Sequence, residues 1–137
     1  MSSYIPKGLT VATRESTERH TVFEYMYRDA GNWKTSGSLL LVGGCPDADA
    51  AIRACLDWSD QFVAEQVRVP SLCPKHFEET GEGPSDLDHA YHEFIGLREA
   101  TPDDFLEAPA GSLLDLVERM RVAAGRWDVT LSPNCFL

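Results

Sequence analysis

Hydrophobic and polar residues alternate along two neighbouring segments near the start of the chain, 21–27 and 33–42. In the first segment the aromatic residues Phe23, Tyr25 and Tyr27 occupy every second position. A period of two with aromatic side chains is typical of a β-strand that is half buried. The two segments therefore predict a hairpin whose aromatic residues share one face of a sheet.

The length of the connection between these strands decides which side chains share a face. A shift of one residue in register turns a whole strand over. A five-residue connection, 28–32, keeps the aromatic residues on the apolar face of the second strand and places Tyr27 opposite Trp33. Gly31 and Asn32 suit the positive-φ positions that such a connection needs.

The rest of the chain mixes both periodicities. Helices are predicted to begin at Pro46, after the capping residue Thr101 and at Ser112, and strands over 61–69, 89–99 and, as a fifth, 127–132. Hairpins outnumber crossover units, which favours an α+β fold: a mostly antiparallel sheet of four to five strands with two or three helices packed on one face. The length of 137 residues suits one domain, 1–137, in which 1–16 is a loose arm or an edge strand.

The negative charge is concentrated in one third of the sequence. From Lys75 to Glu118 there are 12 acidic residues and two basic ones, a balance of −10 that equals the net charge of the chain. Direct binding to nucleic acid requires a basic surface and is disfavoured. A basic protein partner, or simple solubility, fits this distribution.

Nothing in the sequence predicts export or a membrane segment. No apolar run approaches the ~20 residues that span a bilayer, and the first residues do not form a signal peptide. We therefore expect a cytoplasmic protein. In that compartment Cys45, Cys55, Cys73 and Cys135 are expected to be free thiols, with Cys135 the most exposed.

Four residues have the chemistry of zinc ligands: Cys73, His76, His89 and His92. On a strand, His89 and His92 would point to opposite faces because they are three residues apart. The spacing also matches no closed tetrahedral site. We therefore predict no metal and no other cofactor for this set, and no stoichiometric zinc in the purified protein.

Two glutamates fall on predicted apolar faces and are candidates for catalysis together with a neighbouring histidine. Glu65 lies among valines and Glu93 follows His92 directly. A carboxylate on an apolar face must be paired, protonated or exposed to a cavity, and a buried acid can act as a general acid or base. The alternative is that each glutamate pairs with an arginine or lies where the face of the sheet is open to water.

The segment 28–34 is predicted either as a turn or as an anion site. Asp and Asn commonly form turns because their side chains bond the local backbone. The candidate ligand-binding residues are Tyr25, Arg28, Trp33 and Lys34. Arg28 is the one residue of the turn expected to reach Glu65 or Glu93.

The sequence contains no complete catalytic or phosphate-binding motif. Neither a Gly-rich phosphate loop nor a Gly-x-Ser-x-Gly elbow is present. The stretch GGCPD, 43–47, is similar to a nucleophile turn before a helix, but no histidine can be assigned to Cys45 from the sequence.

Three stretches resemble a family of small bacterial proteins: YMYRDAGNWK at 25–34, FVAEQVRVP at 62–70 and DLDHAYHEF at 86–94. Some members of that family are carried in mobile gene cassettes of the integron type. The resemblance covers roughly residues 20–100 and implies a bacterial, cytoplasmic origin. It implies no activity and no catalytic residue.

The leading hypothesis from the sequence is a binding module that holds a small molecule or a protein partner. We expect a homodimer that does not depend on Cys135, because one small sheet face cannot cover all the large aromatic residues. These are Phe23, Tyr25, Tyr27, Trp33 and Trp58. One alternative is a small hydrolase or isomerase that uses Glu65, His92 and Glu93. Another is an acidic decoy that occupies a nucleic-acid-binding protein.

Overall fold

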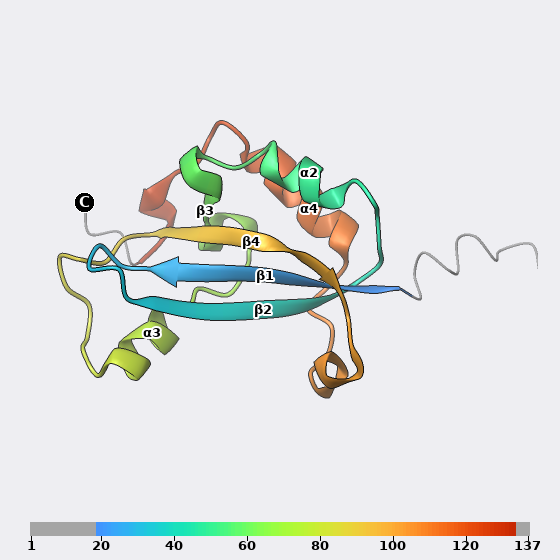
Figure 1. Ribbon diagram of the computed structural model, residues 1–137. Helices are drawn as coiled ribbons and strands as arrows, with labels where there is room; N and C mark the ends of the chain where they lie inside the picture. Colours follow the sequence, from blue (N-terminus) through green and yellow to red (C-terminus); the bar gives the residue numbers. More distant parts are fainter. Residues whose placement is uncertain (1–18, 134–137) are drawn as a thin grey trace, which may run out of the picture.

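The computed structural model describes residues 19–133, which form one four-stranded antiparallel sheet with the strand order β2-β1-β4-β3 (Figure 1). The strands are β1 His20–Arg28, β2 Lys34–Val42, β3 Gln61–Val63 and β4 Tyr91–Glu99. This confirms the predicted α+β class. The prediction for residues 1–16 and that for Cys135 lie outside the described residues.

The β1–β2 hairpin has the predicted faces but a different register. Tyr27 pairs with Thr35 and not with Trp33, so the connection is again five residues long but runs from 29 to 33. Because the shift is two residues, the aromatic residues keep their predicted face. Asn32 has a positive φ of 72°, whereas Gly31 does not, so the prediction for Gly31 is wrong.

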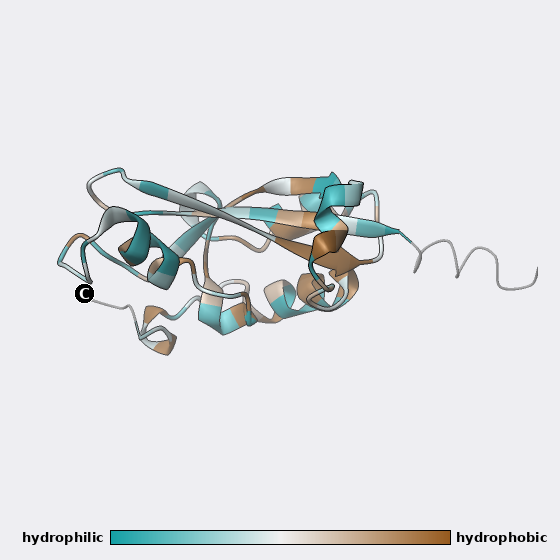
Figure 2. Cartoon of the chain, turned by 90° about the horizontal axis from the view of Figure 1, so that it is seen from below, coloured by the Kyte–Doolittle hydropathy of each residue, from teal (hydrophilic) through white to brown (hydrophobic). Residues whose placement is uncertain are grey.

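Three helices cover one face of the sheet: α2 Ala48–Arg53, α3 Cys73–Thr80 and α4 Leu113–Ala123. Figure 2 shows the strands and the helical layer from below. The core between them contains the buried rings of Phe23, Tyr27 and Phe62 and the apolar stripe of α4, which comprises Leu113, Leu116, Val117, Met120 and Ala123. Burial of this stripe is the main reason that a short helix is stable in water.

One predicted strand extends too far, another is wrong, and one helix was missed. The predicted strand 61–69 ends after Val63 and continues as the 3₁₀ helix η3, Ala64–Val67. The segment 127–132 contains the 3₁₀ helix η5, Val129–Leu131, in place of a strand. The missed helix is α3, which has Pro at its start and Gly81 in the left-handed region at its end. These are ordinary helix signals.

A bulge in β4 changes the face of every residue before it. Glu24 pairs with Gly96 but Tyr25 pairs with Phe94, so Ile95 is the extra residue. Such a bulge breaks the period-two pattern. Phe94 is therefore buried in the core, while Glu93 lies on the opposite face, contrary to the prediction.

The other face of the sheet is partly covered at one end. The 3₁₀ helix η4, Pro102–Leu106, begins with the predicted capping box between Thr101 and Asp104. Arg98 joins it to the sheet through its bonds to Asp104 and Glu24.

A further 3₁₀ turn, η2 Trp58–Asp60, precedes β3. Within residues 19–133, no helix has the length and apolar character needed to cross a bilayer.

Candidate functional site

A pocket of about 130 Å³ lies beside the β1–β2 turn, where α3 and the segment 81–89 approach it. In Figure 1 this is the end of the sheet at which α3 and the yellow loop lie next to the turn. We call it the acidic pocket; its lining includes Asp29, Trp33, His76, Glu82, Leu87 and Asp88. None of its lining residues within 19–133 is a lysine or an arginine.

Asp29 is fixed by the turn that follows β1. Its backbone N–H donates to the Trp33 carbonyl (3.0 Å), and its Oδ1 accepts from the Trp33 amide (3.0 Å). Its Oδ2 lies 2.9 Å from Nε2 of His76. Desolvation raises the pKa of Asp29, but the hydrogen bonds from His76 and from the turn amides outweigh it and leave the pKa below its ordinary value.

His76 is buried on α3 and is held from behind by a chain of side chains. Its Nδ1 lies 2.8 Å from Oγ1 of Thr35, which is buried on β2. Thr35 Oγ1 also lies 3.0 Å from Oε1 of Glu79. The Thr35 hydroxyl thus contacts a ring nitrogen on one side and a carboxylate on the other, and it can donate its proton to either.

The other ring nitrogen of His76, Nε2, lies 2.9 Å from Oδ2 of Asp29. The ring therefore joins the buried Thr35 hydroxyl on one side to a carboxylate of the pocket on the other. A neutral imidazole has one N–H and one lone pair, and both arrangements of these are compatible with the two contacts.

Asp88 completes the cluster from the loop before β4. It is buried, its Oδ1 accepts from the Tyr27 hydroxyl (2.7 Å), and its Oδ2 accepts from the Ser85 amide (2.9 Å). Burial and this bond to Asp88 raise the pKa of Tyr27, whose hydroxyl also accepts from the His89 amide. Ligand atoms of Asp29, His76 and Asp88 all lie within 4.8 Å of one another.

The structure separates the three predicted catalytic residues. His92 is fully buried in the core, where its Nε2 accepts from the Leu72 amide (3.0 Å) and its Nδ1 lies 3.2 Å from the Ala90 carbonyl. Desolvation lowers the pKa of His92 to about 4. A neutral histidine with both nitrogens bonded to the backbone has no free atom for proton transfer.

Glu93 and Glu65 do not share a cavity with His92. Glu93 lies on the opposite face of β4 and forms an ion pair with Arg28, with 2.9 Å between Oε2 and Nε. This is one of the two pairings predicted for Arg28. Glu65 lies on η3, where its Oε1 is buried without a hydrogen-bond partner among the described residues.

The four predicted ligand-binding residues are also dispersed. Tyr25 is buried in the core and donates to the Pro70 carbonyl (2.7 Å), with burial raising its pKa to about 12. Arg28 lies on the open face of the sheet, and Lys34 is exposed. Only Trp33 lines the acidic pocket.

The predicted Cys/His set does not assemble around one point. His89 bonds the Arg28 carbonyl through Nε2 (2.7 Å) and the Tyr91 amide through Nδ1 (3.1 Å), and His92 is bonded to the backbone as described. Burial raises the pKa of the Cys73 thiol to about 11, which makes it a poor thiolate. Of the four residues, only His76 reaches the acidic pocket.

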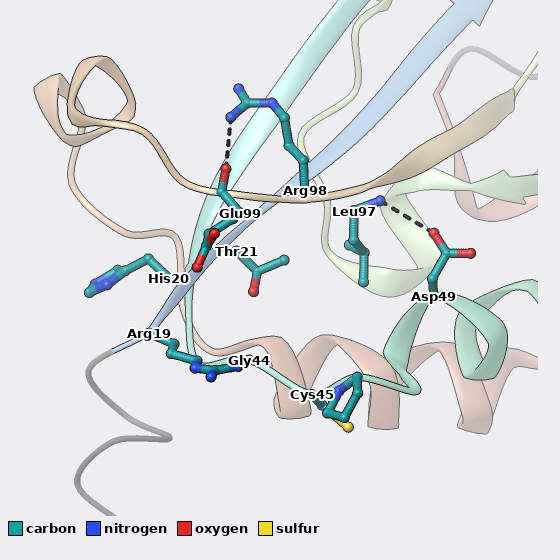
Figure 3. A pocket seen from close by; sticks show the side chains of 10 residues that line it. Arg19, His20, Thr21, Gly44, Cys45, Asp49, Leu97, Arg98 and Glu99 are labelled. Carbon is teal, nitrogen blue, oxygen red and sulfur yellow. Dashed lines mark hydrogen bonds between the residues drawn. The ribbon is translucent and has the colours of Figure 1, made fainter.

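A second hollow of about 280 Å³ lies at the opposite end of the sheet and includes Cys45. Figure 3 shows the His20 ring and the Cys45 thiol on different sides of this hollow. His20 packs edge-on against Phe105, with 4.8 Å between ring centroids. The GGCPD turn thus borders a hollow, but the structure does not bring His20 to Cys45 as a catalytic pair.

Sequence reasoning named His76 as a metal candidate and Asp29 as a turn residue, but it did not connect them and it missed Asp88. The available signal was the stretch DLDHAYH, in which Asp88 precedes two histidines. Its carboxylate is directed by Tyr27, which is 61 residues away in the sequence. No spacing rule encodes such a contact.

Comparisons with protein-family models, with curated proteins and with solved structures give no match to this chain. The resemblance of residues 25–34, 62–70 and 86–94 to a bacterial family therefore stays a prediction.

Proposed function

We propose that this chain is a small binding module that holds a compact, positively charged ligand in the acidic pocket. The observation that supports this most directly is the convergence of two carboxylates and a buried imidazole at one point. The pocket has no basic lining residue among those described, so a cation would meet uncompensated negative charge. Attraction between charges is stronger at a partly desolvated site than in bulk water.

The rim of the pocket favours a ligand with an organic part or a hydrated shell. Trp33 is 67% exposed and Leu87 is 46% exposed, and both line the pocket. An exposed indole face attracts cations through its quadrupole. The small volume limits the ligand to a few non-hydrogen atoms or a hydrated ion.

The enzyme alternative loses its support because Glu65, His92 and Glu93 occupy separate environments.

The acidic-decoy alternative also gains little from the geometry, because many acids of 75–118 are paired within the chain. These pairs join Glu79 to Lys75, Glu93 to Arg28, Asp104 to Arg98, Asp115 to Arg119 and Glu118 to Arg121. A decoy needs a continuous free acidic face.

A protein partner, including a second copy of the chain, has separate support at the edge strand β2. Outward-facing groups of β2 are bonded to Lys75 at Ser36 and to Ala110 at Leu40. Between them, Ser38 faces the same edge and has no partner there within residues 19–133. An unpaired edge is a template for another strand.

Of the five aromatic residues behind the predicted homodimer, Phe23, Tyr25 and Tyr27 are buried in the core, and only Trp33 and Trp58 are exposed. Pairing at the edge of β2 therefore supports a dimer better than the aromatic residues of the sheet do. Light scattering at tens of micromolar should give a dimer mass for the unaltered chain and a monomer mass for Ser38→Pro, which removes the edge N–H. A monomer in both proteins would refute the dimer.

The proposed binding module is also expected to be a cytoplasmic protein of bacterial origin.

Thermal unfolding with a panel of ligands tests the pocket. The panel holds guanidinium, choline, a short diamine and Mn²⁺ as cations, with acetate and phosphate as anions. At least one cation should raise the melting temperature by mass action, and the anions should not. The effect should vanish in Asp88→Asn and persist in Asp86→Asn, an exposed neighbour in the same loop. No shift with any cation, or equal shifts in both variants, would refute the proposal.

A further inference from the structure

The side chains of the acidic pocket have the chemistry of a metal site that is open to solvent on one side. We propose that Asp29, His76 and Asp88 bind one first-row divalent metal ion, which is the positively charged ligand of the proposed function. The inference rests on that function and narrows its ligand class. It concerns a different residue set from Cys73, His76, His89 and His92, which the structure keeps apart.

Donor type is the first argument. One imidazole nitrogen and two carboxylates suit first-row divalent ions, from the harder Mn²⁺ to the borderline Co²⁺ and Zn²⁺. Ca²⁺ and Mg²⁺ prefer oxygen ligands alone. Three protein ligands with remaining positions open to a pocket form a site that retains water or accepts an exogenous ligand.

Distance is the second argument. Around an ion with bonds of about 2.1 Å, neighbouring ligand atoms are roughly 3.0–3.4 Å apart. Here Oδ2 of Asp29 and Nε2 of His76 are 2.9 Å apart, and the whole set with Asp88 lies within 4.8 Å. Side-chain adjustments of about an ångström would complete the coordination shell.

Support from behind each ligand is the third argument. Thr35, which also contacts Glu79, is hydrogen-bonded to Nδ1 of His76. The Tyr27 hydroxyl and the Ser85 amide donate to Asp88, and the Trp33 amide donates to Oδ1 of Asp29. Metal ligands are characteristically oriented by such outer contacts, which also fix the histidine tautomer. Here they leave Nε2 of His76 as the nitrogen available to an ion.

Titration with Mn²⁺, followed by the loss of the free-ion electron paramagnetic resonance signal, tests the site directly. Mn²⁺ is chosen because it avoids thiols, and Cys45 is exposed. One ion should bind per chain. His76→Gln and Asp88→Asn should each weaken binding at least about tenfold, and Thr35→Val should weaken it by about the same factor through loss of the outer contact.

Matched controls are His20→Gln and Asp86→Asn, which make the same chemical changes outside the pocket. Circular dichroism establishes which variants are folded. If Asp88→Asn does not fold, Asp29→Asn replaces it, because that side chain is less buried.

The outcomes separate the two proposals. Binding of Mn²⁺ or Zn²⁺ that is unchanged in His76→Gln and Asp29→Asn would overturn the metal site. Absence of metal binding together with Asp88-dependent binding of an organic cation would overturn the metal site and keep the proposed function. Absence of binding by both classes would refute both.

Discussion

His76 and His92 are both buried and both pack against the ring of Tyr27, with centroid distances of 4.9 Å and 5.3 Å. Their partners differ completely. Within residues 19–133, the ring of His92 bonds only backbone groups, at Leu72 and Ala90. In the same part of the chain, the ring of His76 bonds only the side chains of Thr35 and Asp29, and it borders a pocket.

This difference shows that burial alone does not identify a functional histidine. A histidine whose two ring nitrogens are both hydrogen-bonded to backbone groups stabilises the fold. It has no nitrogen lone pair or N–H left to bind a ligand. A ring that is paired with a carboxylate at a pocket can exchange that contact for an ion. The two residues therefore predict different responses to mutation, pH and cations.

The largest effect is expected for His92→Ala. The substitution removes a fully buried ring and leaves the Leu72 N–H and the Ala90 carbonyl unpaired. We expect the free energy of unfolding to fall by about 3–5 kcal/mol. Urea unfolding measures this loss, and a cost below about 1 kcal/mol would contradict the structural role of His92.

The pH dependence of stability comes next. The pKa of His92 is about 4 in the folded chain and about 6.5 when unfolded. Between these values the unfolded chain binds more protons, so stability decreases as pH falls from 6.5 to 4. The full contribution is roughly 3 kcal/mol, at 1.36 kcal/mol per pKa unit.

Urea unfolding at pH 7 and at pH 4.5 measures this contribution. The loss of stability between the two conditions should be smaller in His92→Gln, which cannot titrate. Carboxylates titrate equally in both proteins and cancel in the comparison. Equal losses would show that His92 is not held neutral by burial.

A smaller effect is expected for Thr35→Val, which supports His76 and not His92. The change keeps the shape of the side chain but removes the hydroxyl that is hydrogen-bonded to Nδ1 of His76. We expect a loss of about 1–2 kcal/mol, the cost of one buried unpaired group. Ser38→Ala on the exposed side of the same strand is the control and should change stability by less than ~0.5 kcal/mol. If Thr35→Val lost no more stability than the control Ser38→Ala, the Thr35–His76 contact would be contradicted.

The smallest effect is expected on the open face of the sheet. Arg28 and Glu93 form two hydrogen bonds, but their side chains are 37% and 22% exposed. A double-mutant cycle with Arg28→Ala and Glu93→Ala should give a coupling energy smaller than the loss of stability in Thr35→Val, because solvent screens the pair. Strictly additive losses would show that the pair contributes nothing, and a larger coupling would make it comparable to the buried histidine contacts.

Particular elements show how far the sequence predicted the fold. Strong period-two and capping signals correctly located β1, β2, η4 and α4, because these patterns act over a few neighbouring residues. The strand predicted at 61–69 was wrong in its second half, where alternating valines continue as η3. A short apolar run is compatible with several backbone conformations, and tertiary packing selects one.

The predicted catalytic set was wrong for a different reason. Glu93 was assigned to the apolar face by strict alternation, and the extra residue Ile95 in the bulge reverses that assignment. A bulge depends on how one strand fits its neighbour. It therefore cannot be read from the periodicity of β4 itself.

The sequence by itself determined the class of the fold, the faces of the first hairpin and the concentration of negative charge in 75–118. These follow from local periodicity and from composition, which do not depend on long-range contacts. Only the tertiary structure decided that Asp29, His76 and Asp88 meet. They lie on a turn, a helix and a loop, and the contacts that orient them join residues 41 to 61 positions apart.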